Sequence, residues 1–251
     1  MNTILVAGLG LIGGSAGMAL RRRGWRVRFL DPHVTLDDAQ RAGAADERVE
    51  TLTADADLIL LATPVDVAVE QLRNLDTKAV VTSAGSVMRA LRDVARGTFI
   101  AGHPLAGSQQ RGLGAAKADL FEGKPWFVDG DHPLVDELVR DCGAVRERVT
   151  AKEHDAGVAL TSHLPQVLST ALAAYLHECG DDALRFAGSG LRTFLRLAGS
   201  DASVWAPVLE ANRDNLAPHA ERVGELVREL TGRDPREAFA KAQALYKRIT
   251  D

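Results

Sequence analysis

The sequence predicts an α/β fold in two parts, a doubly wound, mainly parallel sheet over residues 1–150 and an all-helical C-terminal domain over residues 151–251. In the first part, short apolar runs alternate with amphipathic stretches, as parallel neighbouring strands with crossover connections require. From Lys152 onward, apolar residues recur at helical spacing without a convincing strand. No linker rich in Gly, Ser or Pro separates the parts, so we expect them to pack together.

Five apolar runs in the first part have the length and composition of buried strands. They cover residues 3–7, 25–30, 58–62, 79–82 and 99–102. Helical segments fit between most of these runs. In the second part, residues 156–177, 206–230 and 235–249 have apolar residues at helical spacing, which predicts three long helices. Their apolar faces exceed what a small partner domain can cover, so we expect a homodimer through the helical domain.

A glycine-rich turn follows the first predicted strand in the segment ILVAGLGLIGGS, residues 4–15. Gly8, Gly10 and Gly13 form the pattern G-x-G-x-x-G at the start of a predicted helix. The first glycine permits a tight turn, the second lets a pyrophosphate approach the backbone, and the third allows close helix packing. The helix N-terminus adds amide donors. We therefore predict a Rossmann-type dinucleotide-binding domain, with Leu11 and Ile12 also at the cofactor.

The second predicted strand ends at Asp31, where an acid can hydrogen-bond the adenosine ribose hydroxyls. A carboxylate there repels a 2′-phosphate, so we expect the protein to bind NAD in preference to NADP. A positive charge on Arg28 or His33 can weaken this preference. We also expect Thr63 and Pro64, which follow the third apolar run, to contact the cofactor. The alternative interpretation is a glycine-rich turn followed by a capping aspartate.

Composition excludes several other classes of function. The net charge of -4 and the isoelectric point near 6.0 give no broad basic field for nucleic acid or an anionic membrane. The apolar runs are far shorter than the roughly 20 residues of a membrane-spanning helix. Cys142 and Cys179 are too few for a disulfide framework, which favours the cytoplasm. His154 and His163 lie nine residues apart, so we predict no metal site.

His103 stands at the end of the fifth predicted strand, directly before Pro104, which favours extended geometry at that position. Ligands of open α/β sheets bind at the carboxyl edge of the strands, so we expect the imidazole to face the cofactor crevice. An imidazole there can accept a proton near neutral pH as a hydride leaves.

An ordered set of motifs accompanies His103. They are AGSV at 84–87, GHPLAGS at 102–108, LF at 120–121, HD at 154–155, SHLPQ at 162–166, GLRTFLRLA at 190–198, and Trp205. In this order, and together with the glycine-rich opening, they make the chain similar to the prephenate and arogenate dehydrogenase family over nearly its whole length. No single motif decides the resemblance.

The resemblance implies NAD-dependent oxidative decarboxylation of prephenate to 4-hydroxyphenylpyruvate and CO2 in tyrosine biosynthesis. It implies that His103 hydrogen-bonds the ring hydroxyl and takes its proton while hydride passes from the same carbon to nicotinamide. Loss of the ring carboxylate then gives an aromatic product, and aromatisation supplies the driving force. The resemblance also implies that Ser86 orients His103 near the nicotinamide.

Two arginines provide a candidate anchor for the substrate carboxylates. Arg192 and Arg196 are four residues apart on a predicted helix, so two guanidinium groups share one face at an electrostatic cost that an anion relieves. The resemblance makes Arg196 the principal carboxylate anchor, with Arg192 and Trp205 near the substrate side chain. The alternative is a solvated basic helix face.

Three polar residues bear on the choice of substrate. Ser162 and Gln166 are also four residues apart, so both are expected to point from one helix face into the substrate site. Many family members have histidine in place of Gln166, and some have an acid in place of Gln109. Without that acid the ammonium of arogenate lacks a partner, which favours prephenate.

Several alternatives stay open from the sequence alone. One is an arogenate dehydrogenase that forms tyrosine directly. A second is a 3-hydroxyacid dehydrogenase, although such enzymes usually place a catalytic lysine, or a histidine and glutamate pair, in the helical domain. A third is a nucleotide-binding module without catalysis, against which the intact glycine turn and His103 motif argue.

Overall fold

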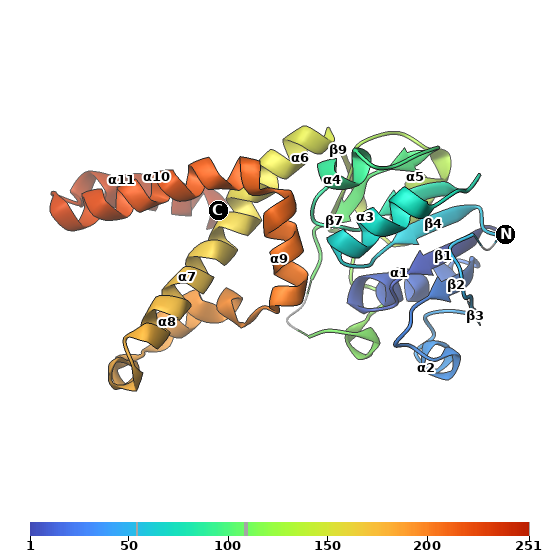
Figure 1. The fold of residues 1–251 in the computed structure, drawn as a ribbon, viewed down its shortest axis with the longest axis horizontal. Helices are drawn as coiled ribbons and strands as arrows, with labels where there is room; N and C mark the ends of the chain where they lie inside the picture. Colours follow the sequence, from blue (N-terminus) through green and yellow to red (C-terminus); the bar gives the residue numbers. More distant parts are fainter. Residues whose placement is uncertain (54, 108–109, 251) are drawn as a thin grey trace.

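The computed structural model describes residues 1–53, 55–107 and 110–250. Its first part is a six-stranded parallel sheet with the strand order β3-β2-β1-β4-β5-β6, and the helical part lies beside it (Figure 1). The strands are β1 (Thr3–Ala7), β2 (Arg26–Leu30), β3 (Glu47–Arg48), β4 (Leu58–Leu61), β5 (Val80–Ser83) and β6 (Phe99–Ile100). This order places a crevice at the carboxyl ends of β1 and β4, where the direction of winding reverses. The predicted α/β class with a Rossmann-type first domain is confirmed.

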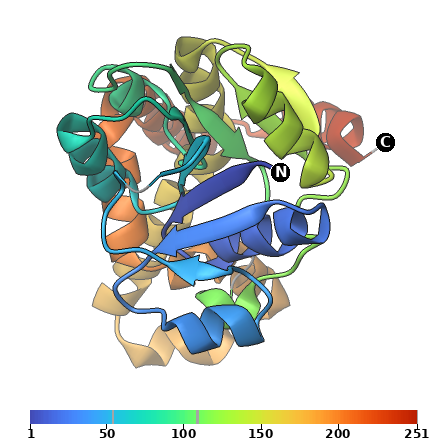
Figure 2. The same cartoon turned by 90° about the vertical axis from the view of Figure 1, so that its right-hand side faces the viewer.

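Helices cover both faces of the sheet (Figure 2). They are α1 (Leu11–Arg22), α2 (Leu36–Arg41), α3 (Val65–Asn74), α4 (Arg89–Arg92) and α5 (Pro133–Asp141). Side chains of α1, α2 and α5 pack with Ile4 and Val6 on one face, whereas side chains of α3 and α4 pack with Leu5 and Ala7 on the other. Because β1 is covered on both faces, its sequence is a continuous apolar run rather than an alternating one.

A second sheet, which the sequence did not predict, follows the first. It contains β7 (Gly102–Pro104), β8 (Pro125–Val128) and β9 (Val145–Arg148) in that order. The strand predicted over residues 99–102 is therefore correct at its start but too long, because β6 ends at Ile100 and Gly102 begins β7 of the second sheet. The break occurs where the Ala101 amide donates to the Asp129 carboxylate, at 2.7 Å.

The helical part begins at Ala151 with a capped helix. The Thr150 side chain accepts from the Glu153 amide while the Glu153 side chain accepts from the Thr150 amide, which satisfies two helix-end donors. The further elements are α6 (Ala151–Val158), the π turn η2 (Ala159–His163), α7 (Leu164–Glu178), the 3₁₀ turn η3 (Asp181–Phe186), α8 (Ser189–Phe194), the 3₁₀ turn η4 (Leu195–Gly199), α9 (Ala202–Ala211), α10 (Arg213–Gly232) and α11 (Arg236–Thr250). A domain boundary at residue 150 stays a prediction.

Two expected helix relations differ from the structure. Ser162 lies in the π turn and Gln166 in α7, so the wider turn changes the face that each presents. Arg192 is in α8 whereas Arg196 is in η4, so the continuous helix predicted to stack them ends between them at Phe194. In both cases an apolar pattern of helical period does not distinguish α, π and 3₁₀ turns.

In the described part of the chain, no helix is long and apolar enough to cross a membrane. Helices α10 and α11 instead extend away from the sheet as a pair (Figure 1). They carry large exposed apolar side chains, among them Phe239, Tyr246 and Ile249, which are 61%, 69% and 73% exposed.

Candidate active site

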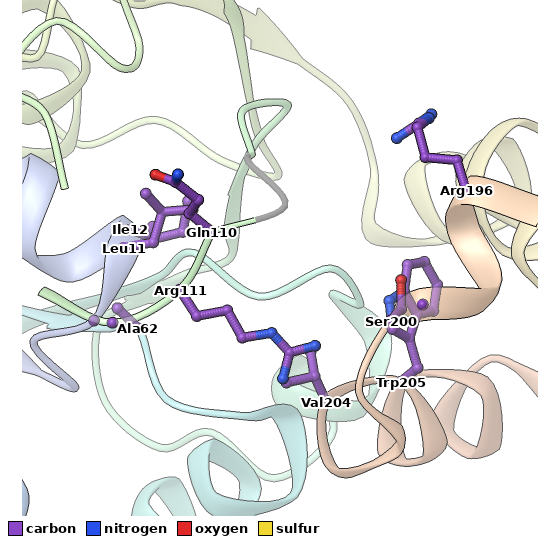
Figure 3. Close-up of a pocket in the computed structure, with 12 residues that line it drawn as sticks. Leu11, Ile12, Ala62, Gln110, Arg111, Arg196, Ser200, Val204 and Trp205 are labelled. Atoms are coloured by element: carbon purple, nitrogen blue, oxygen red, sulfur yellow. The ribbon is translucent and has the colours of Figure 1, made fainter. Parts of the chain in front are cut away.

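A cavity of about 560 Å³ lies between the glycine-rich turn and the helical part (Figure 3). Leu11, Ile12 and Ala62 form one side, and Arg196 and Trp205 lie on the other. The remaining lining residues are Gly10, Gln110, Arg111, Gly112, Gly199, Ser200 and Val204. The structure thus brings predicted cofactor residues and predicted substrate residues together.

The glycine-rich turn has the shape that a dinucleotide pyrophosphate requires. Gly8 has a φ of +86°, and a Cβ there would lie 2.8 Å from the Ala62 carbonyl oxygen. A Cβ on Gly13 would lie 1.9 Å from the Gly8 carbonyl oxygen, so neither position admits a side chain. A Cβ on Gly10 meets nothing within 4 Å, which leaves open space beside the α1 N-terminus. Because no side chain caps α1, its first amides can donate to an anion there.

Asp31 follows β2 at the same edge of the sheet. Its carboxylate accepts from the Leu9 amide and from the His33 amide, both at 2.8 Å, which fixes it beside the glycine-rich turn. Thr63 and Pro64 follow β4, and Pro64 is the residue that precedes α3. These positions fit the predicted contact of Asp31 with the adenosine ribose and the predicted cofactor contacts of Thr63 and Pro64, which stay predictions.

His103 is the middle residue of β7 and is half-buried. Its Nδ1 lies 2.9 Å from Nε2 of His154 in α6, and the two rings meet edge to face with centroids 5.0 Å apart. Nδ1 of His154 lies 2.8 Å from Oδ1 of Asp155. Nε2 of His103 is therefore the ring nitrogen left for a substrate.

Burial keeps the His103 ring neutral. Burial lowers the pKa of His103 to about 3. The His103 ring is therefore unprotonated at neutral pH, and this is the form that can accept a proton.

Ser86 lies half-buried between β5 and α4. Within the described residues no hydrogen bond joins Ser86 to the His103 ring, so its orienting role stays a prediction. Ser83 instead forms hydrogen bonds with β7, the strand that carries His103: its Oγ lies 3.1 Å from the Gly102 amide and 3.2 Å from the Gly102 carbonyl oxygen. A Cβ on Gly102 would lie 2.7 Å from the Ser83 carbonyl oxygen, so glycine is required before His103.

The two arginines of the cavity differ in their partners. Arg111 reaches across the cavity toward Val204 and forms an ion pair with Asp201 at the start of α9 (Figure 3). Arg196 is exposed and has no ion-pair partner among the described residues. Arg192 is exposed in α8 but does not line the cavity within the described part of the chain. Arg196 is thus the cation available to a bound carboxylate.

Gln166 is 3% exposed and its amide is engaged by the protein. Its Nε2 donates to the Leu197 carbonyl oxygen at 2.8 Å and to Thr170 Oγ1 at 3.1 Å, and its Oε1 accepts from Ser200 Oγ at 3.3 Å. Gln166 therefore holds the 3₁₀ turn that carries Arg196. Ser162 is half-buried in the π turn, and the predicted substrate residue Gln109 lies outside the described residues.

Two family models match the chain in order along the sequence. One, described as prephenate dehydrogenase, nucleotide-binding domain, matches residues 16–145, more than half of the 251 residues. The other, described as prephenate dehydrogenase, dimerization domain, matches residues 150–232.

The chain belongs to the prephenate dehydrogenase family.

Members of the family resemble the chain along most of its length. The prephenate dehydrogenase of Lactococcus lactis subsp. cremoris (strain MG1363) is 30% identical, over 93% of this chain and 73% of its own. The crystal structure of prephenate dehydrogenase from A. aeolicus, in complex with hydroxyphenyl propionate and NAD+, has a TM-score of 0.85 at 26% identity and covers 100% of this chain and 96% of that chain. The structure of Synechocystis arogenate dehydrogenase has a TM-score of 0.73 at 25% identity and covers 99% and 97%. The family resemblance predicted from the motifs is confirmed.

In this member of the prephenate dehydrogenase family, sequence reasoning overlooked a buried polar network around His103. His154, Asp155, His163 and Asn212 are all buried. Nδ2 of Asn212 lies 2.8 Å from the Asp155 carbonyl oxygen and 3.0 Å from Nδ1 of His163. The adjacent pair HD at 154–155 was the available signal for this network. A carboxylate that is buried without a hydrogen-bond partner raises the free energy of the folded protein, so a neighbouring imidazole indicates a paired polar group.

Proposed function

We propose that this chain catalyses the NAD-dependent oxidative decarboxylation of prephenate to 4-hydroxyphenylpyruvate and CO2, on the route to tyrosine. Two observations carry the proposal: a neutral, half-buried His103 whose Nε2 has no hydrogen-bond partner among the described residues, and a cavity lined by the glycine-rich turn and by Arg196, which forms no ion pair within those residues. Membership in the prephenate dehydrogenase family supports it and argues against a 3-hydroxyacid dehydrogenase. The A. aeolicus relative, whose structure contains NAD+ and hydroxyphenyl propionate, supports the choice of cofactor and ligand class.

The residues of the chain handle the proton and the charge. NAD+ bound beside the glycine-rich turn would supply the acceptor for a hydride from the ring carbon that carries the hydroxyl. Nε2 of His103 accepts the hydroxyl proton, which favours the departure of hydride from that carbon. The ring carboxylate leaves as CO2 and its bonding electron pair completes the aromatic ring. His103 then returns the proton to the phenol oxygen, so the reaction neither consumes nor releases a proton.

The glycine-rich turn and Asp31 hold the cofactor in this proposal. The α1 amides donate to the pyrophosphate beside Gly10, and the Asp31 carboxylate accepts from the ribose hydroxyls. Leu11, Ile12, Thr63 and Pro64 complete the contacts. The carboxylate at position 31 favours NAD over NADP because it repels a 2′-phosphate.

Arg196 anchors a substrate carboxylate in this proposal, with Trp205 against the substrate and Arg192 near its side chain. Ser162, Gln166 and Gln109 belong to the same proposed substrate site. Neutral amides at these last two positions offer no anion to the ammonium of arogenate, which favours prephenate. Arogenate stays the alternative substrate, since a structurally similar relative is named arogenate dehydrogenase.

We further propose that the chain acts in the cytoplasm as a homodimer formed through its helical domain. Exposed apolar side chains on α10 and α11, and the match to a dimerization-domain model, support the dimer. Two free cysteines, Cys142 and Cys179, agree with a reducing compartment. Nucleic acid and membrane are not expected as partners.

Purified protein mixed separately with prephenate or arogenate, and with NAD+ or NADP+, tests the proposal through the absorbance of reduced cofactor and the release of CO2. We expect the highest kcat/KM for prephenate with NAD+, with one CO2 released for each NADH. Turnover of arogenate alone would assign the alternative substrate. Tight binding of NAD+ without turnover of either substrate would leave only a nucleotide-binding function.

A further inference from the structure

A chain of three side chains leads away from the substrate side of His103. It runs from Nδ1 of His103 to Nε2 of His154 at 2.9 Å, and from Nδ1 of His154 to Oδ1 of Asp155 at 2.8 Å. His154 is 4% exposed and Asp155 is 1% exposed, so water does not compete for these contacts. The proposed function gives neither residue a role.

The Asp155 carboxylate accepts hydrogen bonds, and this sets their direction along the row His103, His154 and Asp155. The Asp155 carboxylate accepts from the Met88 amide at 2.8 Å and from the Arg89 amide at 2.9 Å, so its oxygens act as acceptors. Nδ1 of His154 therefore donates to Asp155, and in a His154 ring that carries a single proton Nε2 has the lone pair. That lone pair requires a proton on Nδ1 of His103. Nε2 of His103 then carries the lone pair that faces a substrate.

Among the described residues, Asp155 pairs with the His154 ring and with no lysine or arginine. Asp129, on the loop after β8, is paired with Arg92, the N–O distance being 3.4 Å. Burial lowers the pKa of His163 to about 4, so that ring is neutral at physiological pH. A positive charge formed on His103 is thus separated from the Asp155 carboxylate by the His154 ring.

Three parts of the chain build this arrangement. His103 comes from β7, His154 and Asp155 come from α6, and the two backbone amides that hold Asp155 come from the start of α4. Nδ2 of Asn212, the residue between α9 and α10, donates to the Asp155 carbonyl oxygen at 2.8 Å. The first turn of the helical part therefore faces His103 in the first part of the protein.

We propose that His154 and Asp155 are positioning residues for His103. They hold the His103 ring in the tautomer with a free Nε2 lone pair and stabilise the imidazolium that forms when the substrate hydroxyl gives up its proton. The same logic applies to any base oriented by an imidazole and a carboxylate behind it. The catalytic consequence rests on the proposed function, whereas the tautomer is a property of the free protein.

Two replacements of His154 test this proposal. His154→Phe fills the space but offers no acceptor to His103, whereas His154→Gln retains an amide oxygen that can accept. Phe127→Leu is the matched packing control, since the Phe127 ring lies against His154 with centroids 5.8 Å apart but has no part in the hydrogen bonds. Because Asp155 also holds the start of α4, its replacement mixes structural and catalytic effects.

The first measurement is the ¹⁵N and ¹H NMR spectrum of the histidine rings in the full-length free protein, with His103 assigned through His103→Asn. We expect a proton on Nδ1 and none on Nε2 of His103 in the wild type and in Phe127→Leu, and loss of this preference in His154→Phe. A proton on Nε2 of wild-type His103 would overturn the proposal, whatever the substrate.

The second measurement is steady-state kinetics with the substrate and cofactor that the wild type uses. We expect kcat to fall roughly 100-fold or more in His154→Phe, with the Kd for NAD+ unchanged and partial recovery in His154→Gln. A wild-type kcat in folded His154→Phe would overturn the role. If the wild type itself turns over neither substrate, the proposed function fails, while the NMR result still decides the tautomer.

Discussion

Arg196 is exposed in the cavity without an ion-pair partner among the described residues, whereas Arg111 is paired with Asp201. We predict that Arg196→Ala raises the KM for prephenate roughly 10- to 100-fold, because it removes a charged hydrogen bond to a substrate carboxylate. The KM for NAD+ should stay unchanged. Initial-rate kinetics with each substrate varied in turn measures both constants.

Arg185→Ala is the charge-matched control for Arg196→Ala, because Arg185 stacks on Phe186 in η3 and does not line the cavity within the described residues. Its KM values should equal those of the wild type. An unchanged KM for prephenate in Arg196→Ala would assign the carboxylate to another group.

His163 predicts a pH-dependent stability. Burial outweighs the attraction of Asp155 and lowers the pKa of His163 from 6.5 to about 4. Between these values the unfolded chain binds a proton that the folded chain does not, so the free energy of unfolding falls as the pH falls from about 6.5 to about 4. Protonation of His163 thus lowers the free energy of unfolding by roughly 3 kcal/mol over this pH range.

Urea denaturation of the wild type and of His163→Gln across this pH range measures that contribution. The wild type should lose stability more steeply toward low pH than the variant does. Parallel curves would show that the His163 ring is not held neutral.

The sequence predicts a base and a cation of the substrate site, but not the groups that hold them. His103 and Arg196 stand in recognisable motifs; Arg196 lines the cavity, and the role of His103 as the base stays a prediction. His154 is 51 residues from His103, and the hydrogen bond between them depends on how the helical part packs on the second sheet. Gln166 stays a predicted substrate residue, but the hydrogen bond from its buried amide to the backbone of the η4 turn could not be predicted from its position. Such pairings depend on tertiary packing, which residue type and spacing do not encode.

Gly10, directly before α1, and Gly17, within α1, should respond differently to replacement by alanine: the first in cofactor affinity, the second in thermal stability. A Cβ on Gly10 meets nothing within 4 Å, whereas a Cβ on Gly17 would lie 2.1 Å from the Ala44 carbonyl oxygen. Gly10→Ala should therefore fold with the thermal stability of the wild type but bind NAD+ at least 10-fold more weakly, because its methyl occupies the space for the pyrophosphate. Gly17→Ala should lower the melting temperature by several degrees, because backbone must move.

Thermal denaturation followed by circular dichroism, with calorimetric titration of NAD+, separates the two effects. Wild-type affinity in Gly10→Ala would mean that the pyrophosphate does not approach this turn.

Strands β1, β2, β4 and β5 lie within a residue or so of their predicted bounds. Three of them, β1, β4 and β5, come from largely apolar runs and are almost fully buried, and such runs have few other uses in an α/β fold. Strand β9 escaped prediction because its sequence, VRER, is mainly charged and its residues are largely exposed. The π turn within the predicted helix over residues 156–177 has the same apolar pattern as an α-helix and was also missed.

The pair of helices α10 and α11 predicts the assembly state. Phe239, Tyr246 and Ile249 are exposed on α11, and contiguous apolar surface of this kind marks an interface. We expect light scattering to give twice the chain mass of 26.9 kDa, and the double variant Phe239→Glu with Tyr246→Glu to give the mass of a monomer. Lys241→Gln, which removes an exposed ion pair with Glu237 from the same helix, should stay dimeric. A monomeric wild type at working concentration would contradict the dimer.

The central claim is that His103 accepts the proton of the substrate hydroxyl, and the kcat of His103→Asn with prephenate and NAD+ tests it most directly. Asparagine has no basic nitrogen, so we predict a loss of roughly 100- to 10,000-fold in kcat. The Kd for NAD+ should match that of the wild type, because the glycine-rich turn is unchanged. A folded His103→Asn protein that forms NADH and CO2 at the wild-type rate would contradict the claim and require another proton acceptor.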